Sequence, residues 1–329
     1  LFHFCSEFCN AIDSLTSADF LKDPETLISK DNKFRLGFFS PSNSTFRYVG
    51  IWYNQQASAM EVVWVANKNN PLKDNSGILI LSTNGNLQVS NSKNETLWSS
   101  NVTNPHSRFS VAQILDSGNL VVEGFPSNRS GENGTTLWMS FQYPTDSVLP
   151  NMRFTLTKNS DTRKVLQSWS DPSDPSIGRF ALGTNSFGLF QLIIWDGDNI
   201  YWRSGPWNGN IFIGTNYRLS YQEDAGGEVL SLVYTNASFS THYRLSYQGI
   251  LEQKLWDSSK KNWTVLLEAP DDQCDIYGTC GEFGSCNSQS SPICSCLRGF
   301  KPKDKEEWKR GNWTQGCIRR KPRQCSIQG

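Results

Sequence analysis

Short runs of apolar residues, or of alternating apolar and polar residues, dominate this chain, and the spacing of an amphipathic helix is almost absent. Residues 78–81, 86–89 and 111–115 are examples, each bounded by Gly, Asn, Ser or Pro. Such runs place apolar side chains on one face of a strand, and the bounding residues favour turns. The pattern therefore predicts an all-β fold.

A strand centred on Trp occurs three times in the first half of the chain, at residues 63–67, 97–101 and 137–141. The turn sequence Gly-Asn-Leu at 85–87 returns at 118–120. A sheet unit of this size cannot bury its inner face alone, so we expect the copies to pack around a shared axis with the Trp rings inside. The Gly-Asn pairs supply turns with positive φ. These features predict a prism of three sheets.

A weaker series of the same kind follows in the second half of the chain. Residues 178–183 are similar to residues 34–39, and a Pro-punctuated segment at 170–175 is typical of a domain boundary. We therefore expect two related β-domains in tandem, the second diverged from the first. The tryptophans of the second series are Trp169, Trp202 and Trp256.

The cysteines divide the chain into two physical regimes. None lies between Cys9 and Cys274, and seven follow in the last part of the chain. The first ~270 residues must be held together by burial of apolar surface, whereas the last ~55 are too few to build much of a core. Clustered cysteines in such a segment indicate an extracellular module stapled by disulfides. The seven are Cys274, Cys280, Cys286, Cys294, Cys296, Cys317 and Cys325.

Other sequence features also predict a secreted glycoprotein. Residues 1–11 are typical of the end of a signal peptide, with the small residues Cys9 and Ala11 placed before a cleavage point. No apolar run approaches the ~18 residues of a membrane span. Lys and Arg number 31, as do Asp and Glu, so no overall charge favours nucleic acid or an anionic membrane. Eight predicted N-glycosylation sites are Asn43, Asn94, Asn101, Asn128, Asn133, Asn236, Asn262 and Asn312.

Six of the clustered cysteines resemble an epidermal-growth-factor-like (EGF-like) module, because a single residue separates the fourth from the fifth. Spacing alone leaves many other pairings open. A zinc site is disfavoured, since the segment has no Cys-x2-Cys pair and no His. Calcium is disfavoured because Pro270 stands where calcium-binding members carry an outer carboxylate, although Asp272 and Gln273 fit; we expect no cofactor. The resemblance implies the disulfides Cys274–Cys286, Cys280–Cys294 and Cys296–Cys317.

Several stretches together resemble plant S-domain (G-type lectin) receptor-like kinases and the related S-locus glycoproteins. These stretches are residues 23–29, 34–41, 48–53, 63–67, 115–121, 138–146, 201–209 and 274–277. The resemblance implies tandem bulb-lectin-like β-prisms, then the EGF-like module and a PAN/apple domain of which only the start is present. Cys325 is similar to the first cysteine of that domain, and we expect it to be free or to lack its partner. The kinase and membrane span of the receptors are absent from this chain. The implied divisions are a signal-peptide remnant at 1–11, a bulb-type lectin domain at 12–158, an S-locus glycoprotein domain at 159–270, an EGF-like module at 271–318 and the PAN start at 319–329.

Bulb lectins hold mannose with the motif Gln-x-Asp-x-Asn-x-Val-x-Tyr. The corresponding residues here are Ser82, Asn84, Asn86, Gln88 and Ser90 in one copy, and Leu115, Ser117, Asn119, Val121 and Glu123 in the next. Only the Asn persists in both copies, and the charged acceptor is lost from each. We therefore interpret Asn84, Asn86, Ser117 and Asn119 as positions of a degenerate sugar site, with Asn86 and Asn119 acting as turn residues. A functional mannose-binding lectin is the alternative.

The sequence does not predict an enzyme. Only His3, His106 and His242 are present, no nucleophile motif occurs, and the paired aspartates lie in turn-like contexts. We expect an extracellular recognition module. The resemblance implies a peptide, lipid or glycan ligand, homodimers or heterodimers with receptor ectodomains, and roles such as recognition of pollen. Loops at 208–217 and 221–227, with aromatics at their tips, are the expected contact surface.

Overall fold

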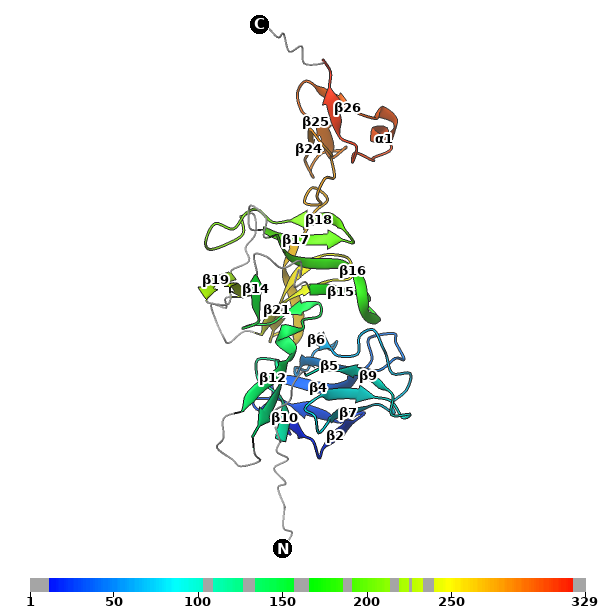
Figure 1. Ribbon diagram of the computed structural model, residues 1–329. Helices are drawn as coiled ribbons and strands as arrows, with labels where there is room; N and C mark the ends of the chain where they lie inside the picture. Colours follow the sequence, from blue (N-terminus) through cyan, green and yellow to red (C-terminus); the bar gives the residue numbers. More distant parts are fainter. Residues whose placement is uncertain are drawn as a thin grey trace.

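A computed structural model of the chain describes residues 12–102, 109–126, 134–156, 166–185, 191–213, 219–224, 227–232 and 240–321. Strands dominate this part of the chain, and its helical elements are the 3-10 turn η1 (Ser140–Gln142) and the short helix α1 (Lys305–Lys309). The prediction of an all-β fold is confirmed. Figure 1 shows two β-sheet bodies and a small C-terminal module arranged in a row.

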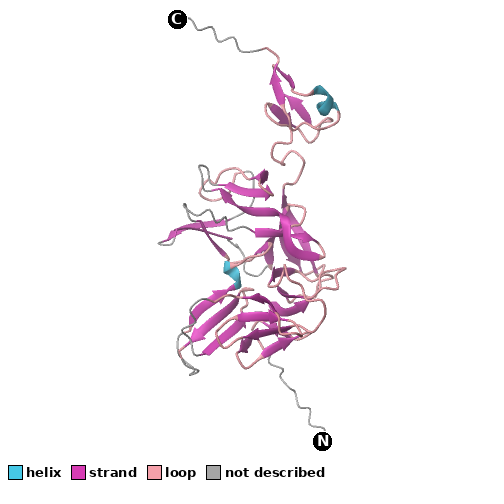
Figure 2. Ribbon diagram, turned by 45° about the vertical axis from the view of Figure 1, so that its right-hand side comes forward, coloured by secondary structure: helices cyan, strands magenta, loops and turns pink. Residues whose placement is uncertain are grey.

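The first body, which we call the first prism, consists of three four-stranded antiparallel sheets (Figures 1 and 2). One sheet contains β3 (Thr26–Ile28), β4 (Phe34–Phe39), β5 (Tyr48–Tyr53) and β6 (Val62–Val65). The next contains β2 (Phe20–Lys22), β7 (Ile78–Leu81), β8 (Leu87–Ser90) and β9 (Thr96–Ser99). The third contains β1 (Ser14–Thr16), β10 (Phe109–Ile114), β11 (Leu120–Phe125) and β12 (Thr135–Met139).

The sequence pattern explains how these sheets close. Burial alternates along β7 and β10, so every second side chain points into the prism. At the axis the rings of Trp64, Trp98 and Trp138 contact one another edge to face, with centroids 5.7 to 5.9 Å apart. The glycines of the two Gly-Asn turns, Gly85 and Gly118, have φ of 76° and 82°. The predicted prism with interior Trp rings is therefore confirmed.

A serine that stands two residues after a strand Trp forms a hydrogen bond at the end of a hairpin, and this arrangement occurs in both bodies. Its hydroxyl accepts a hydrogen bond from a backbone N–H in the first two residues of the neighbouring strand, a group that would otherwise be buried without a partner. The bonds run from Leu87 to Ser100 (3.0 Å), from Leu120 to Ser140 (2.9 Å) and from Leu192 to Ser204 (3.0 Å).

The second body, the second prism, also contains three antiparallel sheets. One contains β13 (Ser147–Val148), β21 (Thr241–Leu245), β22 (Leu251–Asp257) and β23 (Asn262–Ala269). Another contains β14 (Arg153–Leu156), β20 (Gly227–Leu232) and β19 (Leu219–Asp224). The last contains β15 (Leu166–Asp171), β16 (Asp174–Asn185), β17 (Gln191–Asp196) and β18 (Asn199–Arg203).

Two expectations about the boundary between the prisms need correction. The strands β13 and β14 pair with β21 and β20, so residues 147–156 belong to the second prism, and the change of prism falls between 139 and 147 rather than at 158. The Pro-punctuated segment 170–175 is a hairpin turn, because Asp171 pairs with Asp174. Turn-forming residues favour a hairpin as much as a linker, which is why the sequence misled here.

The second Trp series does not repeat the first. Trp202 lies in the main core, whereas Trp169 packs in a separate cluster against first-prism residues that include Tyr48 and Trp52. Trp256 contacts Trp263 on the next strand, with ring centroids 5.8 Å apart. The irregular spacing of this series therefore reflects three different packing roles.

The two prisms share a packed interface. A single cluster of buried apolar side chains runs from Leu15 to Ala269. Tyr53 of the first prism contacts Trp263 of the second at 4.6 Å between ring centroids, and its hydroxyl donates to the Thr241 carbonyl at 3.2 Å. Because apolar surface and hydrogen bonds are both buried there, we infer that the prisms act as one unit.

The C-terminal module, residues 271–321 of the described chain, is smaller. It contains the hairpin β24 (Gly284–Cys286) and β25 (Cys294–Cys296), the pair β26 (Phe300–Pro302) and β27 (Cys317–Arg319), and α1. Asp304 caps α1, since its carboxylate accepts from the backbone N–H groups of Glu306 and Glu307. Among all the described residues, no helix has the length and apolar character needed to cross a membrane.

Candidate functional site

The two asparagines of the degenerate sugar motif are tied into the scaffold. Asn119 is buried, and its Oδ1 accepts hydrogen bonds from the Ser140 hydroxyl and the Phe141 N–H, both at 3.1 Å. Asn86 Oδ1 accepts from the Val102 N–H at 2.7 Å. Each asparagine thus joins the start of one strand to the chain that follows the Trp strand. An oxygen used in this way has less capacity to bind a sugar hydroxyl.

The other two positions of the motif lie in the turns. Asn84 is exposed, and its Oδ1 accepts hydrogen bonds from the Ser82 hydroxyl and the backbone N–H of Asn86. The hydroxyl of Ser117 accepts from the backbone N–H of Asn119 at 3.3 Å. These bonds are typical of Asx and Ser turns. Asn84 and Asn86 therefore lie at the end of the hairpin β7–β8, and Ser117 and Asn119 lie at the end of the hairpin β10–β11.

A pocket of about 450 Å³ lies at the end of the Trp axis. Trp64 and Trp138 are almost fully buried in its lining, while Trp98 is half-buried. Tyr143 stacks on Trp138, with centroids 5.8 Å apart and planes 9° apart, yet its side chain is 56% exposed. Polar residues complete the lining: Lys68, Ser99, Ser100, Asn101, Gln142 and Thr145. An aromatic lining with polar groups and this volume is typical of a small-ligand site.

A cluster of buried charges lies where the prisms meet. Glu61, just before β6, accepts hydrogen bonds from Lys254 Nζ at 2.7 and 2.8 Å, and its Oε1 lies 3.0 Å from His242 Nε2. Arg244 Nε donates to Asp146 at 3.0 Å. The acidic residues precede the second prism in sequence, and the basic residues lie on β21 and β22. These charges are paired, as buried charges must be, and they link the two bodies.

Burial and pairing set the pKa values of this cluster. Burial alone would raise the pKa of Glu61, but the hydrogen bond with His242 and the positive charges of Lys254 and Arg244 hold this pKa at about 2. Burial lowers the pKa of His242, and the attraction of Glu61 only partly opposes it. His242 is therefore neutral at pH 7 and donates from Nε2 to Glu61, which leaves its buried Nδ1 without a partner.

The module holds three disulfides. They join Cys274 to Cys286, Cys280 to Cys294 and Cys296 to Cys317, with Cα–Cα distances of 5.5, 5.4 and 5.8 Å. These pairs are the ones that the EGF-like resemblance implies. Cys325 and the first eleven residues lie outside the described part of the chain, so the predictions of an unpaired thiol and of a signal peptide remain predictions.

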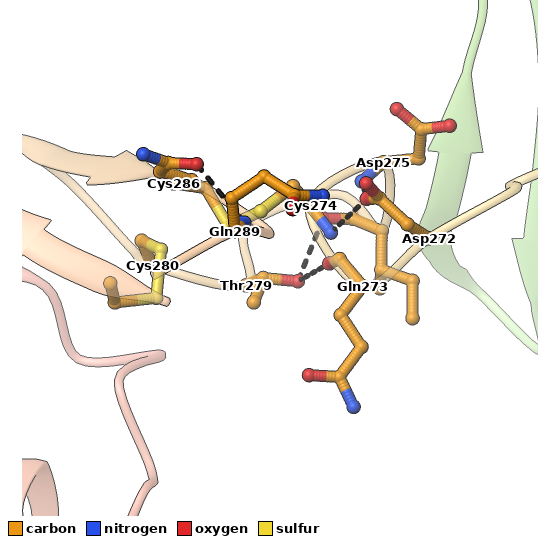
Figure 3. The surroundings of a disulfide bond; sticks show 11 residues. Asp272, Gln273, Cys274, Asp275, Thr279, Cys280, Cys286 and Gln289 are labelled. Carbon is orange, nitrogen blue, oxygen red and sulfur yellow. Dashed lines mark hydrogen bonds between the residues drawn. A yellow bond between two sulfur atoms is a disulfide. The ribbon is translucent and has the colours of Figure 1, made fainter. Parts of the chain in front are cut away.

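The aspartates near the first disulfide serve the local turn (Figure 3). The Asp272 carboxylate accepts from the backbone N–H of Cys274 at 2.6 Å, and the Thr279 hydroxyl donates to the Gln273 carbonyl at 2.9 Å. Asp271, Asp272 and Asp275 are exposed and close together. Burial and the neighbouring Asp271 raise the pKa of Asp275. The hydrogen bonds of Asp272 and Thr279 thus fix the shape of the turn beside the first disulfide.

The predicted glycosylation sites fall into distinct settings. Asn43, Asn94 and Asn101 are exposed and have φ between 52° and 62°, the left-handed region typical of turns. Asn262 Oδ1 and Asn312 Nδ2 are hydrogen-bonded, the first to the Trp263 N–H and the second to Glu307. Asn128, Asn133 and Asn236 lie outside the described residues. Glycosylation at all eight remains a prediction.

The expected contact loops differ in part from the structure. Phe212 is fully buried and contacts Trp207 at 5.0 Å between ring centroids, so it is a core residue rather than an exposed aromatic. Ile213 beside it is 50% exposed. Residues 214–218 lie outside the described part, as do the side chains of 221–227.

Sequence reasoning missed the pocket and the charge cluster. The pocket depends on Tyr143 returning to stack on Trp138, and no periodicity marks that contact. The cluster joins Glu61 to residues more than 180 positions away. One signal was available: His242 is flanked by strand residues, where a titratable side chain indicates either exposure or a buried partner.

The fold is a tandem β-prism of the bulb-lectin class, followed by a disulfide-bonded module. A family model described as D-mannose binding lectin matches residues 61–170, and a model of the S-locus glycoprotein domain matches residues 202–304. The S-locus-specific glycoprotein S6 of Brassica oleracea is 36% identical over 337 residues, which cover 99% of this chain and 76% of that protein. The chain therefore belongs to the family of S-locus glycoproteins and G-type lectin S-receptor-like kinases.

Relatives within this family include much longer proteins. A G-type lectin S-receptor-like serine/threonine-protein kinase of Arabidopsis thaliana is 42% identical over 321 residues, which cover 94% of this chain but 38% of the relative. The chain thus spans well under half of the length of that kinase. The two matching family models are lectin and S-locus glycoprotein models, and neither describes a kinase domain.

Solved structures give weaker matches. A monomeric monocot mannose-binding lectin from Gastrodia elata is 17% identical, with a TM-score of 0.29, and covers 39% of this chain and 96% of its own. The two-domain fetuin-binding agglutinin of Scilla campanulata is 13% identical, with a TM-score of 0.27, and covers 79% of this chain and 88% of its own.

Proposed function

We propose that this chain is the ligand-recognition part of an extracellular S-domain protein, either a receptor-like kinase or a soluble glycoprotein of the same family. The match to both kinds of relative along nearly the whole chain carries this proposal. The rigid pair of prisms supplies a scaffold, and the disulfide-bonded module suits an oxidising compartment. Catalysis plays no part in the role of these residues.

The structure favours recognition of something other than free mannose. The Asn oxygens that the bulb-lectin motif would offer to a sugar are engaged at the hairpin ends, and the acidic residue of the motif is replaced by Asn84 and Ser117. A site that loses its charged acceptor loses the strongest type of hydrogen bond to a sugar hydroxyl. Fold alone does not assign the ligand.

A chimeric receptor tests this proposal. The chain would replace the corresponding segment of a G-type lectin receptor kinase. Autophosphorylation would then be measured while extracellular wash fluid from the plant that produces this chain is applied. We expect a response that requires the intact prisms and is lost in a chimera carrying Trp138→Ala. A correctly displayed chimera that responds to no fraction of the fluid would contradict the proposal.

The alternative is a mannose-binding lectin, and the match to the D-mannose binding lectin model favours it. A glycan array probed with the purified chain separates the two. Our proposal predicts no signal on terminal mannose above that of a reduced and unfolded sample. A mannose signal that free methyl mannoside competes away would establish the lectin instead.

A further inference from the structure

A predicted N-glycosylation site lies in the lining of the pocket at the Trp axis. Asn101 lines the pocket, is exposed, and begins the sequon Asn101-Val102-Thr103. We propose that the first sugars of an N-glycan on Asn101 lie in this pocket and cover the aromatic end of the first prism. The inference rests on the extracellular location proposed above, but not on the identity of any ligand.

Local geometry brings the attachment point next to the aromatic rings. Trp98 lies three residues before Asn101, and Asn101 turns the chain with a φ of 52° shortly after β9. Its own N–H donates to the Ser99 hydroxyl at 3.4 Å, which keeps the turn tight. A sugar attached to Asn101 Nδ2 therefore starts at the rim of the pocket.

The chemistry of the lining suits a pyranose ring. One face of a sugar ring is rich in C–H groups, which pack on aromatic faces, and the exposed Tyr143 and half-buried Trp98 provide such surface. The acetamido and hydroxyl groups of N-acetylglucosamine would meet Ser99 and Gln142 on the polar side.

The charge of the pocket does not demand an anionic ligand. Lys68 is the charged residue in the described lining. Burial lowers the pKa of Lys68, and the attraction of Asp146 partly opposes that effect. A neutral sugar leaves this balance undisturbed, and Lys68 can donate to its hydroxyls.

Two other sequons provide matched comparisons. Asn43 and Asn94 are exposed and have φ of 62° and 59°, much like Asn101. Neither contributes to the lining of the pocket. A property that belongs to turn sequons in general will therefore appear at all three sites, whereas burial of the glycan in the pocket will appear at Asn101 alone.

The test uses the whole chain expressed in a eukaryotic secretory host, with site-resolved glycopeptide mass spectrometry. We expect Asn101 to be occupied, and native peptide-N-glycosidase to release its glycan about tenfold more slowly than the glycan on Asn43, as a stabilising contact of about 1.4 kcal/mol would require. Tyr143→Ala removes one wall of the pocket but keeps the sequon, and should bring the two release rates together.

Stability gives an independent measurement. Thr103→Ala removes the Asn101 glycan while keeping the asparagine, and we expect it to lower Tm by about 2–4 °C and to increase acrylamide quenching of Trp fluorescence. Thr45→Ala, which removes the Asn43 sequon in the same way, should change neither. An empty Asn101, or release at the Asn43 rate with no change in Tm, would overturn the inference. Mannose binding in the array experiment would leave it intact.

Discussion

In the two prisms, buried apolar side chains form a continuous cluster from Leu15 to Ala269, whereas in the described part of the module the buried side chains are those of Cys280, Cys294 and Cys317. The rings of Phe283 and Phe300 stack with their centroids 4.6 Å apart, yet the Phe283 side chain is still 48% exposed. A chain of about 50 residues buries too little surface to fold on apolar contacts alone. The two regions therefore depend on different forces.

The cross-links in the module close short loops, with sequence separations of 12, 14 and 21 residues. In the chain-entropy account, a loop of ~15 residues contributes about 3 kcal/mol. Three such disulfides therefore contribute more to the stability of the module than its exposed aromatic side chains can. The comparison shows that apolar burial stabilises the chain up to about residue 271, whereas disulfides stabilise the part beyond it. Each region should therefore unfold under a different treatment.

Reduction should separate the regions most strongly. With a thiol reductant under native conditions, we expect backbone amides of β24 and β25 to lose protection completely, while those of β8 and β11 remain protected. Hydrogen exchange with mass spectrometry measures both in one sample. Protection of the module after verified reduction would contradict the account, as would collapse of the prisms.

Truncation of a core aromatic should have the opposite selectivity. Trp138→Ala removes a ring that contacts Trp64, Trp98 and Tyr143, and should cost about 3–5 kcal/mol of unfolding free energy. Leu297→Ala, at a 47% exposed position of the module, should cost about 0.5 kcal/mol or less. Chemical denaturation followed by Trp fluorescence would measure both. Equal losses of unfolding free energy in the two variants would contradict the claim that the two regions depend on different forces.

Breaking the buried charge cluster should uncouple the prisms. Glu61→Ala leaves Lys254 buried without its partner and should cost about 3–5 kcal/mol. Glu306→Ala in the module removes an exposed partner of Lys309 and should stay within about 0.5 kcal/mol. Calorimetry should also show one transition splitting into two in the first variant. A single transition at an unchanged temperature would show that the cluster adds nothing.

Acidification should have the smallest effect. The pKa of His242 is lowered in the folded chain, so below its ordinary value of 6.5 the unfolded state binds more protons and stability falls as the pH falls. From pH 6.5 to 5 the loss from this group is at most about 2 kcal/mol. Glu61, with a folded pKa of about 2, adds a further loss only below about pH 4.5.

Melting curves between pH 7 and 5 would check this expectation, with His242→Gln as the comparison. The variant should show a flatter dependence on pH in this window even if its stability is lower throughout. An equally steep dependence in the variant would assign the effect to other groups.

The Trp strands and Gly-Asn turns predicted the first prism from sequence because both features repeat with local spacing. The resemblance likewise implied the three cysteine pairs now seen in the module. The role of Asn119 was predicted only as a turn residue, since its bond to Phe141 spans a hairpin that local sequence does not specify. The boundary near 147 was missed because β13 and β14 pair with strands about 75 to 100 residues later, beyond any local pattern.

The central claim is that the surviving asparagines of the sugar motif hold the prism rather than a ligand. Asn119→Ala tests it with two measurements on one variant: unfolding free energy and calorimetric titration with methyl mannoside. Asn84→Ala, at an exposed turn position, is the control.

The account predicts that Asn119→Ala loses about 1–3 kcal/mol, because the buried Ser140 hydroxyl and the partly buried Phe141 N–H both lose their acceptor. It also predicts that neither the unmodified chain nor either variant shows saturable heat with the sugar. Saturable binding by the unmodified chain, abolished by Asn119→Ala at unchanged stability, would contradict it.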